Sequence, residues 1–197
     1  LLGEGALGQE LPFLKEVDKY EIGVMKRQLE RGINCPLTSS CGRLLDAVSA
    51  LIGIRGRVDY EAQAAVELEM AAEELAAIEP YPFTIVEQAG VRIVRLKDLF
   101  QAILLDMGKG LAVGSISARF HRSIAQMVTE MCRGIARERG LKRVALSGGV
   151  FQNRLLLRLA ADLLEREGFM VLTHSQVPTN DGGISLGQAV IANFTAG

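Results

Sequence analysis

The stretch RVALSGGVFQNRLLLRLAADLL, residues 143–164, contains the pattern that decides the fold. It opens with the strand-like run RVALS, passes through a pair of glycines, and continues as leucines at helical spacing. A second strand-like run, FMVLTH, follows at 169–174, and a further helical segment, ISLGQAVIANF, occupies 184–194. Strands and helices that alternate through short connections indicate an α/β sheet with at least one parallel pair of strands.

The chain before this stretch is expected to be mainly helical, apart from one β-hairpin. The segment PFTIVEQAGVRIVRL, 82–96, is rich in β-forming residues and has a turn at Gln88-Ala89-Gly90. Ser40 is placed to cap a helix, and Gly32 is placed to end one. Apolar residues at helical spacing predict helices over 14–29, 42–53, 60–78, 96–110 and 114–139.

Composition indicates an ordinary globular protein. The 197 residues carry a formal net charge of −1, so the sequence has no electrostatic footprint of nucleic-acid binding. The sequence has no run of about 18 apolar residues, so we expect no membrane span. Because no linker rich in proline, serine or glycine divides residues 1–197, we expect one domain with a helix-rich part, 1–110, and an α/β part, 111–197.

The cysteines and histidines predict neither a disulfide framework nor a zinc site. The three cysteines lack regular spacing, and the two histidines, His121 and His174, do not form an HxxxH pair. Free thiols in a reducing, cytoplasmic compartment are therefore the expectation. His121 lies among the apolar residues of a helix and is expected in or near the core, whereas His174 lies closer to the predicted strand ends.

The carboxyl ends of the two predicted strands are the places where a ligand is expected, because open α/β sheets bind ligands there. One end is followed by Ser147-Gly148-Gly149 and the other by the loop from His174 to Gly183. The glycines allow a phosphate or nucleotide to approach the backbone, and the following helix offers N–H groups to an anion. A tight turn that needs glycine explains the same residues equally well.

Four polar residues near these loops and helix starts have two explanations each. Asn153 can cap a helix, or hold a base or a sugar hydroxyl. Asp181 can cap the last helix, or bind a cation beside phosphates. Asp46 either faces solvent or hydrogen-bonds ribose hydroxyls. Gln63 and Glu61 either belong to the first turn of a helix or form a second wall of the same pocket.

Five segments of the chain resemble, in order, the C-terminal part of HypF-type carbamoyltransferases. The segments SGGVFQN and NDGGISLGQA are the most specific, and the resemblance covers about 34–189. The wider family is TsaD-like and includes enzymes that make threonylcarbamoyl-adenosine on tRNA. The five segments are SSCGRLLDAVSALIG, YEAQAAVELE, ARFHRSIAQMV, VALSGGVFQNRLLL and VPTNDGGISLGQA.

The resemblance implies a fold of the actin/Hsp70/sugar-kinase type, with a nucleotide and a divalent metal ion (iron, zinc or magnesium) in a cleft between two lobes. It implies a carbamoyltransferase that uses carbamoyl-adenylate, made from carbamoyl phosphate and ATP. The implied acceptor is the C-terminal cysteine thiol of a partner, HypE, in the maturation of nickel–iron hydrogenases. Neither nucleic acid nor a membrane is an implied partner.

Carried over by motif, Asp46 matches the residue that holds the ribose, and Gly148 and Gly149 match the glycines of the nucleotide loop. Asn153 matches the asparagine beside the nucleotide, and Asp181 matches a metal ligand. Transfer from an adenylate needs a bound leaving group and a polarised carbonyl, rather than a nucleophile from the enzyme. That chemistry agrees with a sequence in which no catalytic Ser/His/Asp motif is recognised.

The sequence also departs from the family pattern. Gln63 falls near a glycine of the TsaD-type pocket and is assigned only loosely, and the HxxxH metal pair of the family is missing. We therefore expect about half of a transferase cleft, inactive on its own. The alternatives are a small-molecule O-carbamoyltransferase, a tRNA threonylcarbamoyl transferase, and a nucleotide-binding module without activity. The tRNA-modifying enzyme would be expected to show GEAFDK and YPGGP, where this sequence has GRLLDA and YEAQAA.

Overall fold

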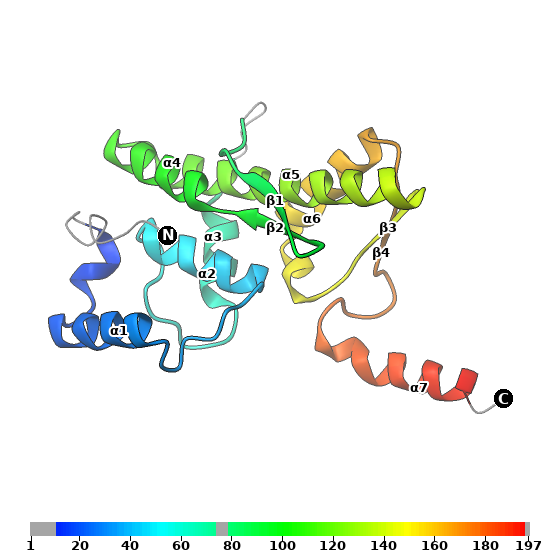
Figure 1. Ribbon diagram of the computed structural model, residues 1–197, viewed down its shortest axis with the longest axis horizontal. Helices are drawn as coiled ribbons and strands as arrows, with labels where there is room; N and C mark the ends of the chain where they lie inside the picture. The colour runs from blue at the N-terminus through cyan, green and yellow to red at the C-terminus, as the bar shows by residue number, and fades with distance from the viewer. Residues whose placement is uncertain (1–10, 74–78, 196–197) are drawn as a thin grey trace.

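The computed structural model of the chain describes residues 11–73 and 79–195. Helices dominate, and the described strands form two separate two-stranded sheets. Figure 1 shows the long helix α5 running across the molecule, with α1 and α7 lying away from it on opposite sides of the view. This mixed α/β architecture with a helix-rich first half is the one that the sequence predicts.

The described elements, in chain order, are η2 (Pro12–Lys15), α1 (Lys19–Arg31), α2 (Cys41–Leu51), α3 (Gln63–Ala71), β1 (Thr84–Gln88), β2 (Val91–Arg95), α4 (Lys97–Gly108), α5 (Val113–Arg139), β3 (Arg143–Leu146), η3 (Gly149–Gln152), α6 (Arg154–Arg166), β4 (Met170–Thr173), η4 (Asp181–Gly183) and α7 (Ile184–Thr195); η marks a 3-10 turn.

α1 ends at Gly32 and α2 begins after Ser40, as the sequence predicts, but α2 ends at Leu51, short of the predicted 53, and α1 begins later than predicted. Gly32 ends α1 in the left-handed conformation, with φ of 64°, and Ser40 caps α2 by accepting the N–H of Arg43 at 3.3 Å. The predicted start at residue 14 is wrong, because η2 comes first. A capping box of Asp18 and Glu21 then opens α1.

The predicted helix over 60–78 is too long at both ends. α3 begins at Gln63, and the chain leaves the helical conformation at Ala72, where ψ is 125°; residues 74–78 lie outside the described residues. The backbone N–H of Glu73 donates to the carbonyl of Gly114 at 3.2 Å, so the end of α3 docks on the start of α5. This tertiary contact ends the helix, and no local sequence signal marks it.

The β-hairpin forms as predicted and leads into α4. Ala89 and Gly90, with φ of 52° and 76°, make the two-residue turn, as a type I′ turn requires. Gln88 pairs with Val91 in the antiparallel register. An ion pair between Arg92 and Glu138 ties the hairpin to α5. The three cysteines are free, in agreement with the predicted thiols.

The α/β part contains the predicted parallel pair. β3 and β4 pair in parallel, with Leu146 opposite Thr173, and α6 connects them and packs against α5 and β4. The N-cap of α6 is Asn153, preceded by the 3-10 turn η3, which sequence reasoning did not anticipate. Because β3 and β4 are parallel, both strands end at the same edge of the sheet.

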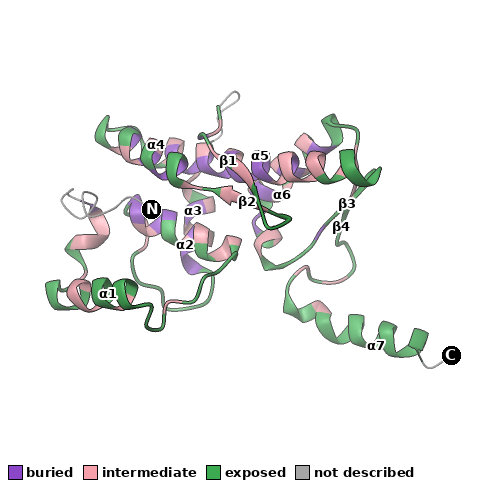
Figure 2. Cartoon of the chain, viewed as in Figure 1, coloured by how far each residue is buried: buried purple, intermediate pink, exposed green. Residues whose placement is uncertain are grey.

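The core lies along α5, against which α3, α4 and α6 pack, and α2 joins the core through its contacts with α3 (Figure 2). Figure 2 also shows that α7 is exposed along its length and that β3 and β4 bury little of their surface. No helix within the described residues is both long and apolar enough to cross a membrane. Side chains with under 2% exposure include Leu45, Val48, Leu68, Tyr81, Leu99, Ile103, Ile116, Phe120, Leu156 and Leu164.

Candidate functional site

The two loops that follow β3 and β4 are bonded to each other, and we call residues 147–153 and 174–183 together the rim. The N–H of Gly148 donates to the carbonyl of Thr179 at 2.9 Å, and the Thr179 hydroxyl donates back to the carbonyl of Gly148 at 3.1 Å. The Ser147 hydroxyl lies 2.9 Å from Nε2 of His174. The prediction that both loops share one edge of the sheet is confirmed.

The glycine loop leaves open space over its backbone. Gly148 has φ of 103°, a conformation that favours glycine, and no atom lies within 4 Å of the position a Cβ would take there. At Gly149 a Cβ would meet only Cβ of Asn180, at 3.9 Å. A ligand can therefore approach the backbone of this loop without displacing a side chain. The exposed loop leaves room for a phosphate or nucleotide, whose binding here stays a prediction.

The two explanations for Asn153 are not exclusive. Its Oδ1 accepts the N–H of Leu156 at 2.7 Å, which is the predicted cap of α6. Its Nδ2 lies 2.9 Å from Nε2 of His121 on α5. Only 7% of Asn153 is exposed, so most of the residue is built into the protein.

The start of α6 is not the open anion site that the sequence suggests. The N–H of Leu155 donates to a carboxylate oxygen of Glu69 at 3.0 Å, and the N–H of Leu156 is taken by Asn153. Glu69 comes from α3, so a helix far away in sequence supplies the negative charge that the helix dipole favours. An anion bound at the rim would therefore meet the glycine loop rather than these two N–H groups.

Asp181 lies at the rim, and the structure gives its predicted capping role to a neighbour. Asn180 accepts the N–H of Gly182 at 3.1 Å and caps η4, while Asp181 begins that turn and is exposed. A Cβ at Gly183 would lie 2.9 Å from the carbonyl oxygen of Pro178, so the loop folds back closely on itself. Among the described residues, no three His, Cys, Asp or Glu side chains gather to hold a metal ion.

Asp46 and Gln63 sit on the helices beside the rim. α2 contacts η3, so the helix that carries Asp46 lies against the glycine loop. Asp46 is partly exposed and lies 3.5 Å from Arg43 of its own helix. Gln63 is buried and uses both ends of its amide locally, accepting the N–H of Asp59 at 2.8 Å and donating to Glu67 at 2.9 Å. A nucleotide role for either residue stays a prediction.

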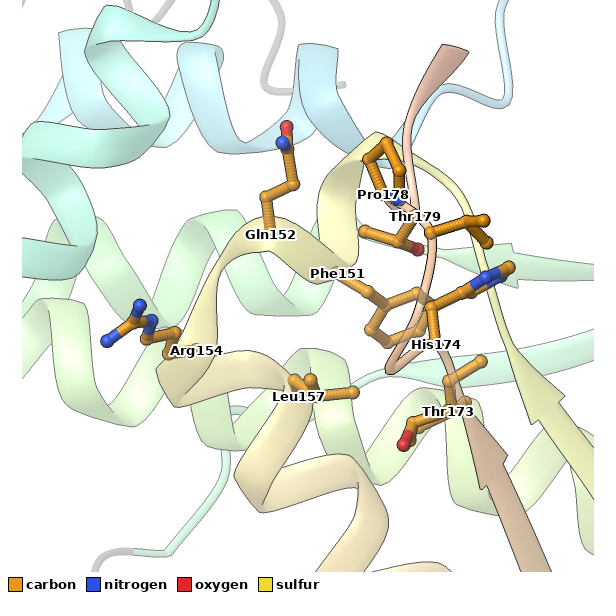
Figure 3. A pocket seen from close by; sticks show the side chains of 10 residues that line it. Phe151, Gln152, Arg154, Leu157, Thr173, His174, Pro178 and Thr179 are labelled. Carbon is orange, nitrogen blue, oxygen red and sulfur yellow. The ribbon is translucent and has the colours of Figure 1, made fainter. Parts of the chain in front are cut away.

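A cavity of about 370 Å³ opens at the rim (Figure 3). Its floor is apolar, and the ring of Phe151 lies beside Leu157 and His174, whereas Gln152 and Arg154 extend away from the ring. Threonines and His174 supply polar atoms at its edge. An apolar floor with a few polar groups is typical of small-molecule sites.

Sequence reasoning missed the two contacts of the histidines. The Ser147–His174 contact joins residues 27 positions apart, and the His121–Asn153 contact joins residues 32 positions apart. The parallel pairing of β3 and β4 could have predicted the first, because Ser147 and His174 both follow directly on paired strand ends. An imidazole at this distance from a hydroxyl forms a hydrogen bond with it, so this pair also joins the two loops of the rim.

Comparisons with known proteins agree with this geometry. Residues 2–188 match the family model described as "Carbamoyltransferase, Kae1-like Domain, second subdomain". The chain is 37% identical over 163 residues to a carbamoyltransferase HypF of Synechocystis, covering 82% of this chain and 20% of that protein. It is 38% identical over 170 residues to a HypF homolog of Cupriavidus necator, covering 83% of this chain and 43% of that protein.

A solved structure is also similar. The crystal structure of full-length HypF in the phosphate- and nucleotide-bound form matches with a TM-score of 0.86 and 42% identity, over 93% of this chain and 24% of that one. The chain thus spans only a part of the length of its relatives. On the family match and these similarities together, the chain belongs to the HypF carbamoyltransferase family and corresponds to the second subdomain of the Kae1-like domain.

Proposed function

We propose that the rim is one wall of the nucleotide site of a carbamoyltransferase. In the proposed reaction, the carbamoyl group of carbamoyl-adenylate, made from carbamoyl phosphate and ATP, moves to the C-terminal cysteine thiol of HypE. The observation that carries the nucleotide part is the open backbone at Gly148, held against the loop after β4 and close to Asn153. The nucleotide-bound form of the similar HypF supports the same part.

The proposed transfer requires no covalent bond between the substrate and this chain. The thiol sulfur would attack the carbamoyl carbon, the bond from that carbon to the phosphate oxygen would break, and AMP would leave with the electron pair. The proton of the thiol must pass to a base. In this scheme the rim binds the phosphate and Asp46 the ribose hydroxyls, so the chain holds and orients the leaving group.

The divalent metal ion of the family prediction is not assigned a step. Asp181 is exposed at the rim and could bind a cation, but the described residues do not bring further His, Cys, Asp or Glu side chains to it in a group of three. A cytoplasmic location and the partner HypE likewise stay predictions.

A second candidate is a nucleotide-binding module without turnover of its own. The geometry of the rim favours this candidate, because a cleft between two lobes needs a second wall. In addition, α7 and the β3–β4 sheet are largely exposed. Incubating the purified chain with carbamoyl phosphate, ATP and HypE separates the two candidates. We expect no thiocarboxamide from the chain alone; its formation would contradict the half-cleft account.

Nucleotide binding itself is tested by calorimetric titration of the chain with ATP. We expect Asn153→Ala to weaken binding roughly tenfold, because it removes polar atoms that orient the rim. Asp18→Ala is the matched control, since it also deletes a helix cap, that of α1, a helix that the structure does not place beside the rim. Equal affinity in wild type and Asn153→Ala would remove Asn153 from the site.

A further inference from the structure

We propose that His121 is a positioning residue of the rim, which holds the Asn153 amide in the orientation that nucleotide binding requires. The inference rests on the proposed nucleotide function of the rim. It concerns a residue on α5 that is fully buried, with 0% exposure, and that cannot itself meet a ligand. Its evidence is a chain of hydrogen bonds whose directions can be assigned one by one.

The first assignment is the proton on the His121 ring. Nδ1 lies 2.8 Å from the carbonyl oxygen of Ser117, and a carbonyl only accepts, so Nδ1 carries the hydrogen. The Ser117 hydroxyl donates to the carbonyl of Leu68, so its oxygen, 3.4 Å from Nδ1, can act there only as an acceptor. The neutral ring therefore presents a lone pair at Nε2.

The second assignment is the orientation of the Asn153 amide. Nδ2 lies 2.9 Å from His121 Nε2 and donates to its lone pair, while Oδ1 accepts the N–H of Leu156. A rotated amide would place an oxygen against the lone pair and an NH₂ group against the N–H of Leu156. Both contacts would be repulsive and both side chains are buried, so the ring tautomer and the Leu156 N–H together hold the amide in this orientation.

The third step connects this orientation to the rim. Asn153 directly follows η3, and its backbone N–H donates to the carbonyl of Val150 at 3.2 Å. The residue thus fixes the end of the glycine loop on the one side and the start of α6 on the other. An asparagine amide has a second N–H and a second lone pair, and the fixed amide presents these in one orientation to a ligand at the rim.

Two substitutions separate this role from simple packing. In His121→Gln, the amide oxygen can accept the hydrogen bond of Asn153, as Nε2 does. In His121→Leu, nothing can accept it. Ile103→Ala is the matched control, because Ile103 is also fully buried, on α4, and takes no part in the hydrogen-bond chain. Thermal unfolding of each variant shows how much stability it loses.

The first measurement needs no nucleotide. The ¹⁵N spectrum of the wild-type chain should show His121 neutral with its hydrogen on Nδ1, and the side-chain amide of Asn153 should shift in His121→Leu but not in Ile103→Ala. A hydrogen on Nε2 would overturn the proposal. So would an Asn153 amide that does not respond to His121→Leu.

The second measurement is the affinity of each variant for ATP. We expect a loss of roughly tenfold or more for His121→Leu, and values within about threefold of wild type for His121→Gln and Ile103→Ala. Equal affinities of wild type and His121→Leu would overturn the proposal, and so would losses that follow only stability. If wild type bound no ATP, the proposed nucleotide function of the chain would fail, and the nucleotide-free spectra would still decide whether His121 positions Asn153 and the loop.

Discussion

At the start of α6, Asn153 uses the two ends of its amide for different purposes. The oxygen caps the helix and the nitrogen meets His121, so a residue assigned to a ligand site is also a structural joint between α5 and α6. The buried contact works only while His121 is neutral, because a protonated ring would turn a hydrogen toward the NH₂ group of Asn153. The ionisation of one residue therefore matters for the fold.

Stability should depend on the ionisation of His121. Burial lowers its pKa below the ordinary 6.5, against the opposing effects of the Ser117 carbonyl and the charge of Glu69. As pH falls below about 6.5, the unfolded chain takes up a proton that the folded chain does not, so the free energy of unfolding falls by up to about 1.4 kcal/mol per pH unit until the folded residue titrates.

Urea denaturation of wild type and His121→Gln at several pH values measures this effect. The wild type should lose stability more steeply between neutral pH and mildly acidic pH than the variant does. Equal slopes for the two proteins would show that His121 is not the group responsible.

At the scale of elements, the docking of α3 on α5 decides where α3 ends. A Cβ at Gly114 would lie 2.7 Å from the backbone oxygen of Ala71, closer than real contacts allow. The Ser115 hydroxyl also donates to the Glu73 carboxylate at 2.6 Å, just after α3. The absence of a side chain at residue 114 therefore lets the two helices meet and brings α3, with Glu69, to the start of α6.

Adding a methyl group at Gly114 should destabilise the protein. We expect Gly114→Ala to lower the free energy of unfolding by roughly 1–3 kcal/mol, because the methyl overpacks a backbone contact. Gly108→Ala is the control, since nothing lies within 4 Å of its added Cβ, and this change should be neutral or stabilise by up to about 1 kcal/mol. Chemical denaturation measures both, and equal effects would contradict the role of this contact.

Elements whose signals are local could be predicted from the sequence. Ser40 and Gly32 mark helix ends, and Ala89-Gly90 marks the hairpin turn, because caps and turns depend on residues next to one another. The end of α3 and the occupied start of α6 could not be predicted. Each depends on a residue far away in sequence, Gly114 in one case and Glu69 in the other.

At the scale of the whole molecule, the candidate site was predicted in its position and only partly in its bonding. The parallel strands brought Ser147, Gly148 and the loop after β4 to one rim, as the alternation of strands and helices indicates. The local use of Gln63 and the capping role of Asn180 were not anticipated, because an amide side chain gives the same sequence signal whether it meets a loop or a ligand.

The exposed elements are also a property of the whole molecule. Phe194 is 81% exposed and Ile191 is 64% exposed on α7, and most residues of β3 and β4 are exposed, among them Met170 at 61%. Parallel sheets are normally covered on both faces. The chain matches only 24% of the length of the similar HypF structure, so these surfaces agree with a subdomain of a larger protein.

The central claim is that a nucleotide binds at the rim, and backbone amide spectra of the chain titrated with ATP test it most directly. The account predicts that the amide signals of Gly148, Gly149 and residues 180–183 shift progressively with ATP, while the signal of Gly23 on α1, which lies apart from the β3–β4 sheet in Figure 1, stays in place. Signals at the rim that do not move at saturating ATP, or shifts confined to other parts of the chain, would contradict it.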